Sequence, residues 1–579
     1  MIETRGLNGA EAFLHVLGHM GVDRIFASPG SEWSPVWEVL AKPGKEEKIP
    51  LYLSCRHEET AVGMASGYAK ASGKLPAVMI HTTVGSLHAT MALRAALHEQ
   101  TPMVVFSGES IGFGEDEGPD PGGQWLRHLA DIGGPARLVE HCVKWSFCVN
   151  TKAVLPATIQ RACHLAMAAP RGPVFVSVPM EFLFDEMISN APASPAMPLQ
   201  PVADPRGIEE LAGLLAEAEN PVIISEEAGR TAAVVERLIE MAEILGAPVI
   251  ETRSTTFLNF PRTHPLHGGF EPREHLKEAD LIFLLAAVGP WHPPSALPKA
   301  GVKLAVLDEN PLHSELPFWG YPFDLCLTGE VEESLSLLVE ELKKRISSGE
   351  PKRAARAEKW RKRFQEQREA WKKEALALKD SKPIDTRWAV YELGQVLPSD
   401  AIVVEETITH RLAVHRYLDR LKPGSFFAGC TGGLGTGLGT ALGVKAAEPR
   451  RPVIAIIGDG SFNYNPALAA LGFSQEYGMP ILIVLLNNYG YLSMKSGLPK
   501  YFPQGWATRT RNFVGTSITP SPDYATITRA FDGYGEMVDE PGAVRSALER
   551  GLKAVTSGQV ALIDIRLEPV AQSGSTSYK

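Results

Sequence analysis

The chain has 579 residues, of which 44% are hydrophobic and 21% charged, and its formal net charge is −10. This composition is normal for a globular protein of several domains, and the negative charge argues against nucleic acid as a partner, because nucleic-acid surfaces normally need a basic face. No apolar run approaches bilayer-spanning length, so we expect no membrane contact. Six scattered cysteines and the lack of a signal-peptide core predict a cytoplasmic location.

Two changes in composition divide the chain into three blocks. Residues 187–205 are rich in Pro, Ala and Ser, whereas residues 343–382 are dense in Lys, Arg, Glu and Ala. Each block alternates short apolar runs with helical stretches, which is typical of parallel sheets covered by helices. We predict an α/β fold with three doubly wound parallel-sheet domains at 1–188, 200–345 and 383–570, and a charged helical linker at 346–382.

Three polar residues follow predicted strands of the first block. Ser31, Glu58 and His81 each come shortly after a short apolar run, and Glu58 also precedes an Ala- and Gly-rich helical stretch, 60–72. Ligand crevices of parallel sheets lie at the carboxyl ends of the strands, so Ser31 and His81 are candidates for binding or catalysis. Each alone is more often structural, and the helix dipole accounts for Glu59 better than for Glu58.

The third block contains a pattern that predicts a metal and phosphate site. One apolar run leads to Gly458-Asp459-Gly460-Ser461, and the next leads to Asn487-Asn488. Parallel strands of a βαβ unit point the same way, so Asp459 and Asn488 should meet at one sheet edge. Carboxylate and amide oxygens suit Mg²⁺, which completes its shell with phosphate oxygens, and the small residues of the turn leave backbone N–H groups free for phosphate.

This pattern resembles the diphosphate-binding motif of thiamine diphosphate (ThDP) enzymes. Here 26 residues, 461–486, separate Gly-Asp-Gly from Asn-Asn, close to the interval in that family. The three blocks also match the pyrimidine-binding, central and diphosphate-binding domain order of its decarboxylase and acetolactate synthase branch. The resemblance covers nearly the full length and implies ThDP and Mg²⁺ as cofactors.

The resemblance assigns cofactor roles to residues of the first and third blocks. Glu58 matches the glutamate that activates the aminopyrimidine, and Leu434 matches the apolar residue that separates the two rings of the cofactor. Thr407 and Thr409 are weaker candidates for the outer phosphate, because Glu405 adds negative charge beside them. The implied cofactor-binding set is Glu58, Thr407, Thr409, Gly432, Leu434, Asp459, Gly460, Ser461, Asn488 and Gly490, and the implied metal ligands are Asp459, Asn488 and Gly490.

The substrate-side residues resemble those of benzoylformate decarboxylase. Ser31, His81 and His292, the last after the apolar run 281–288 of the central block, match its Ser and two His. With Glu58 they form the implied catalytic set, and histidines of near-neutral pKa suit the proton transfers of such a reaction. The implied function is non-oxidative decarboxylation of a 2-oxo acid with carboligase activity, and the substrate is a small 2-oxo acid or other carbonyl compound.

Other functions remain open. One is an acetolactate synthase-like carboligase or a lyase that cleaves hydroxyketones or diketones, and the other is a non-catalytic ThDP-binding regulatory homologue, against which the motif residues argue. A pyruvate decarboxylase is disfavoured, because residues 489–496 contain no acid. The central block lacks the glycine-rich and arginine-bearing motifs of flavin-binding relatives, so FAD is doubtful. Because the cofactor of this family spans two subunits, we expect at least a homodimer and favour a homotetramer.

Overall fold

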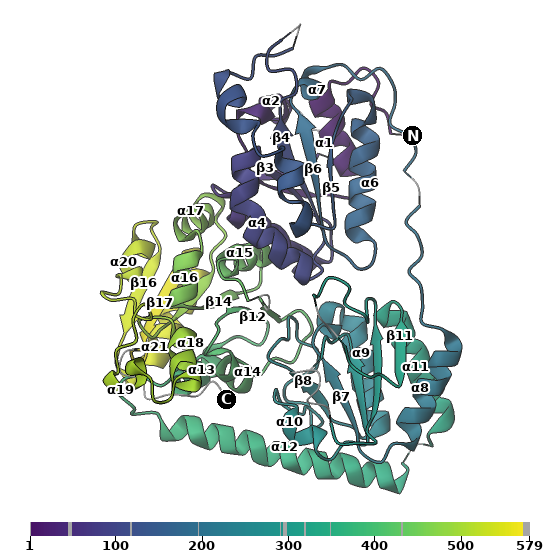
Figure 1. Cartoon of the computed structure of the whole chain (residues 1–579). Coiled ribbons are helices and arrows are strands. Elements are labelled where there is room, and N and C mark those ends of the chain that lie inside the picture. Colours follow the sequence, from purple (N-terminus) through teal and green to yellow (C-terminus); the bar gives the residue numbers. More distant parts are fainter. Residues whose placement is uncertain are drawn as a thin grey trace.

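The computed structural model describes residues 2–43, 49–115, 118–194, 196–289, 291–292, 298–317, 320–347, 349–429 and 432–570. It contains three α/β domains, each built on a parallel sheet, as predicted (Figure 1). Pro290 and Pro293, which flank Trp291-His292, and Thr431, which precedes Gly432, lie outside the described residues. Among the helices described, none has the length and apolar character needed to span a membrane.

The first domain contains a six-stranded sheet with the order β2-β1-β3-β4-β6-β5. Strands β3 and β6 are buried along their whole length, which explains why they read as continuous apolar runs. Its elements are α1 (Gly9–His19), β1 (Arg24–Ser28), α2 (Ser34–Ala41), β2 (Leu51–Ser54), α3 (Glu58–Ser72), β3 (Ala77–Ile80), α4 (Thr83–His98), β4 (Met103–Glu109), α5 (Pro135–Leu138), β5 (Trp145–Cys148), α6 (Leu155–Met167), β6 (Pro173–Pro179) and α7 (Glu181–Phe184).

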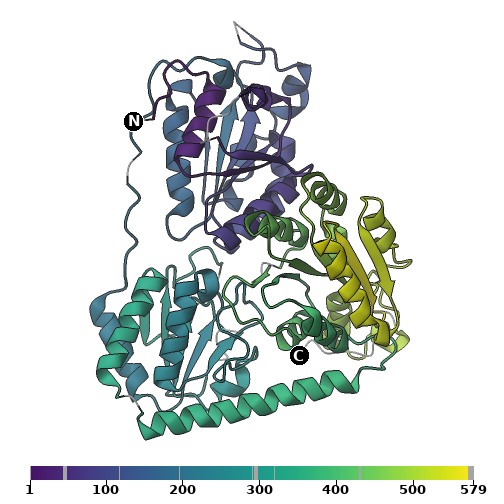
Figure 2. The same ribbon diagram turned by 180° about the vertical axis from the view of Figure 1, so that it is seen from behind.

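The central domain contains a five-stranded sheet with the order β11-β10-β9-β7-β8, and an extended segment leads to it from the first domain (Figure 1). Its elements are α8 (Pro205–Glu217), β7 (Pro221–Ser225), α9 (Ala232–Leu245), β8 (Val249–Glu251), α10 (Arg273–Leu276), β9 (Leu281–Leu285), β10 (Lys303–Asp308), β11 (Leu325–Thr328) and α11 (Val331–Arg345). The charged segment that follows forms the long helix α12 (Pro351–Ala377), which runs from this domain to the third (Figure 2). Its Trp360 and Phe364 pack into the central core.

The third domain contains a second six-stranded sheet, with the order β13-β12-β14-β15-β17-β16. The turn after β14 differs from the prediction, because Asp459 already begins a short helix, α16. The elements are α13 (Thr386–Val396), β12 (Ile402–Glu406), α14 (Arg411–Tyr417), β13 (Phe426–Ala428), α15 (Gly437–Ala447), β14 (Val453–Gly458), α16 (Asp459–Tyr464), α17 (Ala467–Tyr477), β15 (Leu482–Asn487), α18 (Leu492–Tyr501), α19 (Trp506–Thr510), α20 (Tyr524–Arg529), β16 (Tyr534–Val538), α21 (Val544–Thr556) and β17 (Ala561–Arg566).

The first and third sheets share one topology. Numbered within each domain, both have the strand order 2-1-3-4-6-5 with all neighbours parallel. The order reverses between the first and third strands, and open α/β sheets bind ligands outside the carboxyl ends of the strands at such a switch point. The two switch points lie after β1 and β3 in the first domain and after β12 and β14 in the third.

Helices α3 and α15 join these two domains through close backbone contact. A Cβ atom on Gly67 would lie 2.0 Å from the Thr440 carbonyl oxygen, and one on Gly443 would lie 1.9 Å from the Met64 carbonyl oxygen. Only glycine fits at such distances. The glycines therefore hold α3, which begins at Glu58, at a fixed place against the third domain.

Candidate active site

Three oxygen atoms meet at the carboxyl ends of β14 and β15 in the third sheet. Asn488 Oδ1 lies 2.8 Å from the Gly490 carbonyl oxygen and 3.1 Å from Asp459 Oδ1. Asp459 is 2% exposed, and its Oδ2 has no hydrogen-bond partner among the described residues. In this orientation of the amide three acceptors face one another and repel, and a hard cation between them would satisfy all three, whereas without a cation the turned amide would donate to Gly490 and Asp459. The donor set therefore fits Mg²⁺.

Burial shapes the charge of this corner. It raises the pKa of the Asp459 carboxyl to about 7, although backbone N–H groups of the same corner oppose the shift. A carboxylate held this way is costly to ionise without a counter-charge. A divalent cation would supply that charge, so a bound cation favours the ionised form of Asp459.

His410 and Thr386 orient the Asn488 amide. Burial lowers the pKa of His410 to about 4, so its imidazole is neutral, and Nε2, 3.2 Å from Asn488 Nδ2, accepts a hydrogen bond from the amide. His410 Nδ1 lies 3.0 Å from Thr386 Oγ1 and donates to it. In this tautomer of His410 the amide oxygen of Asn488 faces Asp459, as a bound cation requires. Asn487 instead donates to Asp564 at 3.0 Å, so its side chain links the neighbouring strands β15 and β17.

Gly490 is held by a neighbouring strand-like segment. The Tyr491 N–H donates to the Thr516 carbonyl at 2.7 Å, and the Ile518 N–H donates to the Tyr489 carbonyl at 2.8 Å. A Cβ atom on Gly490 would lie 2.1 Å from the Thr516 carbonyl oxygen, so glycine is required there. Gly460 and Ser461 lie buried at the start of α16, beside Asp459.

Thr407 and Thr409, which both follow β12, lie in different surroundings. Thr407 is buried, and both its N–H and its hydroxyl donate to Glu405, whose carboxylate also pairs with Arg411 at 2.9 Å. Arg411 therefore offsets the negative charge that we expected to weaken this segment as a phosphate site. Thr409 instead lines a cavity of about 530 Å³ together with His410.

Leu434 lies half-buried in a loop that Glu406 holds. The Glu406 carboxylate accepts from the Gly435 N–H at 2.7 Å, the Thr436 N–H at 3.1 Å and Asn465 Nδ2 at 2.7 Å. Burial raises the pKa of Glu406 to about 7. Gly432, at the start of the loop, is exposed and has a φ of +72°, which favours glycine.

At the first switch point, Glu58 and His81 lie close together. An added Cβ on Gly85 would lie 3.1 Å from Glu58 Oε1 and 3.1 Å from His81 Cβ, so both side chains border this glycine. His88 Nδ1 lies 3.3 Å from Glu58 Oε2, a contact that the sequence does not reveal. The helix α3 begins at Glu58, two residues earlier than predicted.

A buried carboxylate that sequence reasoning missed holds His81. Glu32 is 1% exposed, and its Oε2 and Oε1 lie 2.9 and 3.0 Å from His81 Nδ1. Burial lowers the pKa of His81, but the hydrogen bond and charge of Glu32, together with Glu58, outweigh it, and the net shift is upward. An acid directly after the Pro-Gly-Ser turn was the only available signal.

Ser31 and His292 are the remaining predicted residues, and both are exposed. Ser31 is exposed and follows Gly30, against which the His81 ring packs. His292 is exposed and follows β9 of the central domain. Among the described residues no hydrogen bond or ion pair joins Ser31, His292 or Glu58 to the Asp459 corner. We refer to the Glu58–His81 region of the first sheet and the Asp459 corner of the third as the two half-sites.

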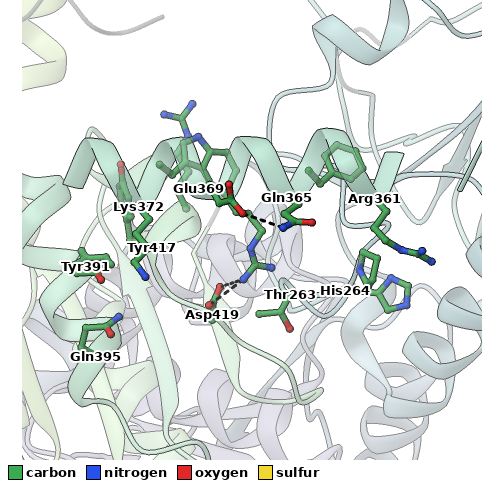
Figure 3. A pocket seen from close by; sticks show the side chains of 15 residues that line it. Thr263, His264, Arg361, Gln365, Glu369, Lys372, Tyr391, Gln395, Tyr417 and Asp419 are labelled. Carbon is green, nitrogen blue, oxygen red and sulfur yellow. Dashed lines mark hydrogen bonds and ion pairs between the residues drawn. The ribbon is translucent and has the colours of Figure 1, made fainter. Parts of the chain in front are cut away.

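A groove elsewhere on the molecule belongs to neither half-site. It has a volume of about 560 Å³ and runs beside α12 (Figure 3). Arg368 and Asp419 form an ion pair across it at 3.2 Å, and Gln365 donates to Glu369 at 3.0 Å. It shares Arg416 and Tyr417 with the cavity that Thr409 lines, but none of the residues predicted to bind cofactor, metal or substrate lines it.

Comparisons with known proteins identify the family. Three thiamine pyrophosphate enzyme domain models match the chain: the N-terminal binding domain at residues 7–114, the central domain at 208–338 and the C-terminal binding domain at 408–565. The chain therefore belongs to the thiamine pyrophosphate enzymes, and it carries their cofactor-binding domains.

Several relatives align over almost the whole chain. Benzoylformate decarboxylase of Pseudomonas aeruginosa is 27% identical, over 96% of this chain and 98% of its own length. The acetolactate synthase isozyme 3 large subunit of Escherichia coli is 26% identical, over 97% and 95%. The structure of a ThDP-dependent 4-hydroxybenzoylformate decarboxylase of Rhodococcus jostii shares the fold, with a TM-score of 0.79 at 24% identity, over 97% of this chain and 99% of its own.

Proposed function

We propose that this protein is a ThDP- and Mg²⁺-dependent lyase that removes carbon dioxide from a 2-oxo acid and has carboligase activity. The observation that carries the proposal is His81, which is held by Glu32 at the switch point of the first sheet beside Glu58. A histidine at the carboxyl end of β3, where ligands of such sheets bind, suits proton transfer to a substrate. The similarity to benzoylformate decarboxylase supports the same reaction class.

The third domain would hold the cofactor. Asp459, Asn488 and the Gly490 carbonyl would bind the metal, Gly460 and Ser461 would approach the diphosphate, and Thr409 would line the outer phosphate. Gly432 and Leu434 would contact the ring system. Bound ThDP supplies a carbon nucleophile and an electron sink for the carbon–carbon bond.

The first and central domains would serve the substrate. Glu58 would share a proton with a ring nitrogen of the aminopyrimidine, and His81 would donate a proton from Nε2. Ser31 and His292, both on exposed rims after strands, would orient the substrate carboxylate. The burial of Glu32 beside His81 keeps that part of the site partly shielded from water.

The complete site would form between two copies of the chain. Apolar side chains are exposed next to both half-sites: Val84 and Leu87 on α4, close to His88, and Tyr464 and Leu468 near α16 and α17. Such exposed groups are typical of an interface. A homodimer is the minimum unit of this proposal, and a homotetramer would repeat it.

Mixed dimers test this arrangement. Glu58→Gln and Asp459→Asn chains should each be inactive, but a mixed dimer would contain one site with both native residues. A one-to-one mixture should therefore recover about a quarter of the wild-type activity, because half of the dimers are mixed and half of their sites are intact. No recovery in mixed dimers isolated by two affinity tags would place both residues of a site in one chain.

The reaction itself is tested by carbon dioxide release from aromatic, branched and short 2-oxo acids, with ThDP and Mg²⁺ added. Release with an aldehyde product supports the proposal. Release with a hydroxyketone product supports the second candidate, an acetolactate synthase-like carboligase, which the Escherichia coli relative favours. No release would redirect the search to a lyase for hydroxyketones or diketones, or to a non-catalytic ThDP-binding protein.

We do not propose FAD as a cofactor of the central domain. The switch point of the central sheet is acidic, with Glu226 and Glu227 after β7 and Asp308 at the end of β10. Glu226 is buried and accepts from the Val288 N–H at 2.8 Å, and burial raises the pKa of Asp308 to about 7. Carboxylates at this position repel the phosphates of a dinucleotide.

A further inference from the structure

We propose that Glu32 is a positioning residue that binds His81 through Nδ1 and directs Nε2 of the imidazole into the reaction site. The chemistry of this role rests on the proposed function, whereas the contact between the two residues does not. Glu32 is fully buried in its side chain, and both of its oxygens lie within 3.0 Å of the same ring nitrogen.

The surroundings of Glu32 leave no space for another arrangement. A Cβ atom on Gly108 would lie 1.9 Å from Glu32 Cγ, and one on Gly30 would lie 2.4 Å from Glu32 Oε2. The Gly30 N–H also donates to Glu32 Oε1 at 3.3 Å. Gly30 and Gly108 therefore leave the space that the Glu32 side chain occupies, and a larger residue at either position would displace it.

His81 is held by its backbone as well as by its ring contacts. Its backbone N–H donates to the Ser28 carbonyl at 3.2 Å, which joins His81 to the end of β1. The Trp125 ring lies edge-on to the His81 ring at 6.5 Å between centroids. With Nδ1 committed to Glu32, Nε2 is the nitrogen left for substrate, and it has no hydrogen-bond partner among the residues described.

The charges around His81 favour its protonated form. Glu32 faces it from the turn after β1, and Glu58 faces it from α3, while Trp125 contributes a neutral ring. His88 contacts Glu58, with its Nδ1 3.3 Å from Glu58 Oε2. A protonated His81 would donate from Nε2 and keep its Nδ1–H on the Glu32 carboxylate, so Glu32 both orients the acid and stabilises its charge.

The test measures the titration of His81 directly. Diethyl pyrocarbonate reacts with neutral imidazole, so the rate of His81 modification against pH, followed by peptide mass spectrometry, gives its midpoint without any turnover. We would compare the wild type with Glu32→Gln, which keeps the shape but removes the charge, and with Glu38→Gln, an exposed acid of α2, as the matched control. Circular dichroism would establish that each variant is folded.

The wild-type midpoint should lie above the ordinary value, and Glu32→Gln should lower it by about one pH unit or more, whereas Glu38→Gln should leave it unchanged. Glu32→Gln should also lower kcat about 10²-fold with unchanged KM and ThDP affinity. An unchanged midpoint in folded Glu32→Gln would overturn the inference. If that variant does not fold, a wild-type midpoint below the ordinary value would overturn it. Absence of carbon dioxide release would contradict the proposed function alone, because the titration needs no substrate.

Discussion

The first and third domains have the same strand order, yet their switch points carry different chemistry. Each places a buried carboxylate at this position: Glu32 in the first and Asp459 in the third. Glu32 is paired with an imidazole at 2.9 Å, whereas Asp459 has one oxygen without a partner and faces two further oxygens. The first arrangement suits the movement of protons, and the second suits a metal ion.

The comparison shows how one fold supports two roles. Topology decides where ligands lie, because both sites form at carboxyl ends of neighbouring parallel strands, β1 and β3 in the first sheet and β14 and β15 in the third. The partner of the buried carboxylate then decides the chemistry. A histidine partner inside the protein satisfies the carboxylate of Glu32, whereas Asp459 has an oxygen without a partner that an external cation could complete.

The largest expected effect comes from Asp459→Asn. This change removes the only carboxylate of the oxygen cluster, so we expect Mg²⁺-dependent ThDP affinity to fall at least about 10²-fold and turnover to vanish. Isothermal titration calorimetry with Mg²⁺ and ThDP measures the loss. Glu392→Gln, which changes a buried acid of α13 in the same domain that pairs with Arg545, serves as the control and should retain affinity. Equal affinity in Asp459→Asn and wild type would contradict the metal assignment.

Glu58→Gln should separate binding from turnover. The variant keeps the shape and the hydrogen-bonding capacity of the side chain but cannot share a proton, so we expect turnover to fall at least about 10²-fold while ThDP affinity changes little. Steady-state kinetics and the same calorimetric titration test both parts. Full activity would show that the activating acid is elsewhere, and Glu59→Gln would then be the next variant to examine.

His81→Ala should cause a smaller loss confined to the chemical step. We expect kcat to fall about 10²-fold, with the ThDP affinity unchanged, because His81 lies on the first sheet and the metal corner lies on the third. His141→Ala, at an exposed position of the same domain, is the control. Equal kcat for wild type and His81→Ala with every substrate would remove His81 from the mechanism.

The sequence predicted those features that depend on local pattern. The apolar runs and the residues directly after them predicted the three parallel-sheet domains and the convergence of Asp459 and Asn488, which the structure places 3.1 Å apart. His81 was singled out by its place after a strand and Glu58 by the family resemblance, and their roles stay predictions. The fold and the meeting of Asp459 with Asn488 could be predicted because the ends of parallel strands meet by topology alone.

The features that were missed depend on contacts distant in sequence. Glu32 lies 49 positions from His81, and His410 lies 78 positions from Asn488, so no periodic pattern joins them. The need for glycine at Gly30 and Gly108 arises from the volume of Glu32, which only the packed structure defines. The partner of a buried charge is therefore the part of such a site that a single sequence conceals.

Cofactor affinity should depend on pH through Asp459. Its pKa is raised to about 7 by burial, and a metal binds the ionised form, so protons compete with the metal below that pH. We expect the apparent affinity for Mg²⁺ to weaken by up to about tenfold per pH unit as the pH falls below 7, and to level off above it. Titrations from pH 5.5 to 8.5 measure this slope, and a flat profile would contradict the raised pKa.

The smallest expected effect concerns the stability of the protein without its cofactor. Because the pKa of Asp459 in the folded state lies above its usual value, stability from this group is present below that usual value and is lost as pH rises toward about 7. Asp459→Asn removes this loss, so the metal-free variant should melt about 2 °C or more above wild type at pH 8, with a smaller gap at pH 5.5. Differential scanning calorimetry in EDTA measures both gaps. Saturating Mg²⁺ and ThDP should reverse the order, because only wild type gains binding free energy. For Glu32→Gln, the order of melting temperatures relative to wild type should not reverse when Mg²⁺ and ThDP are added, because the Glu32 carboxylate is already paired with His81 within the chain.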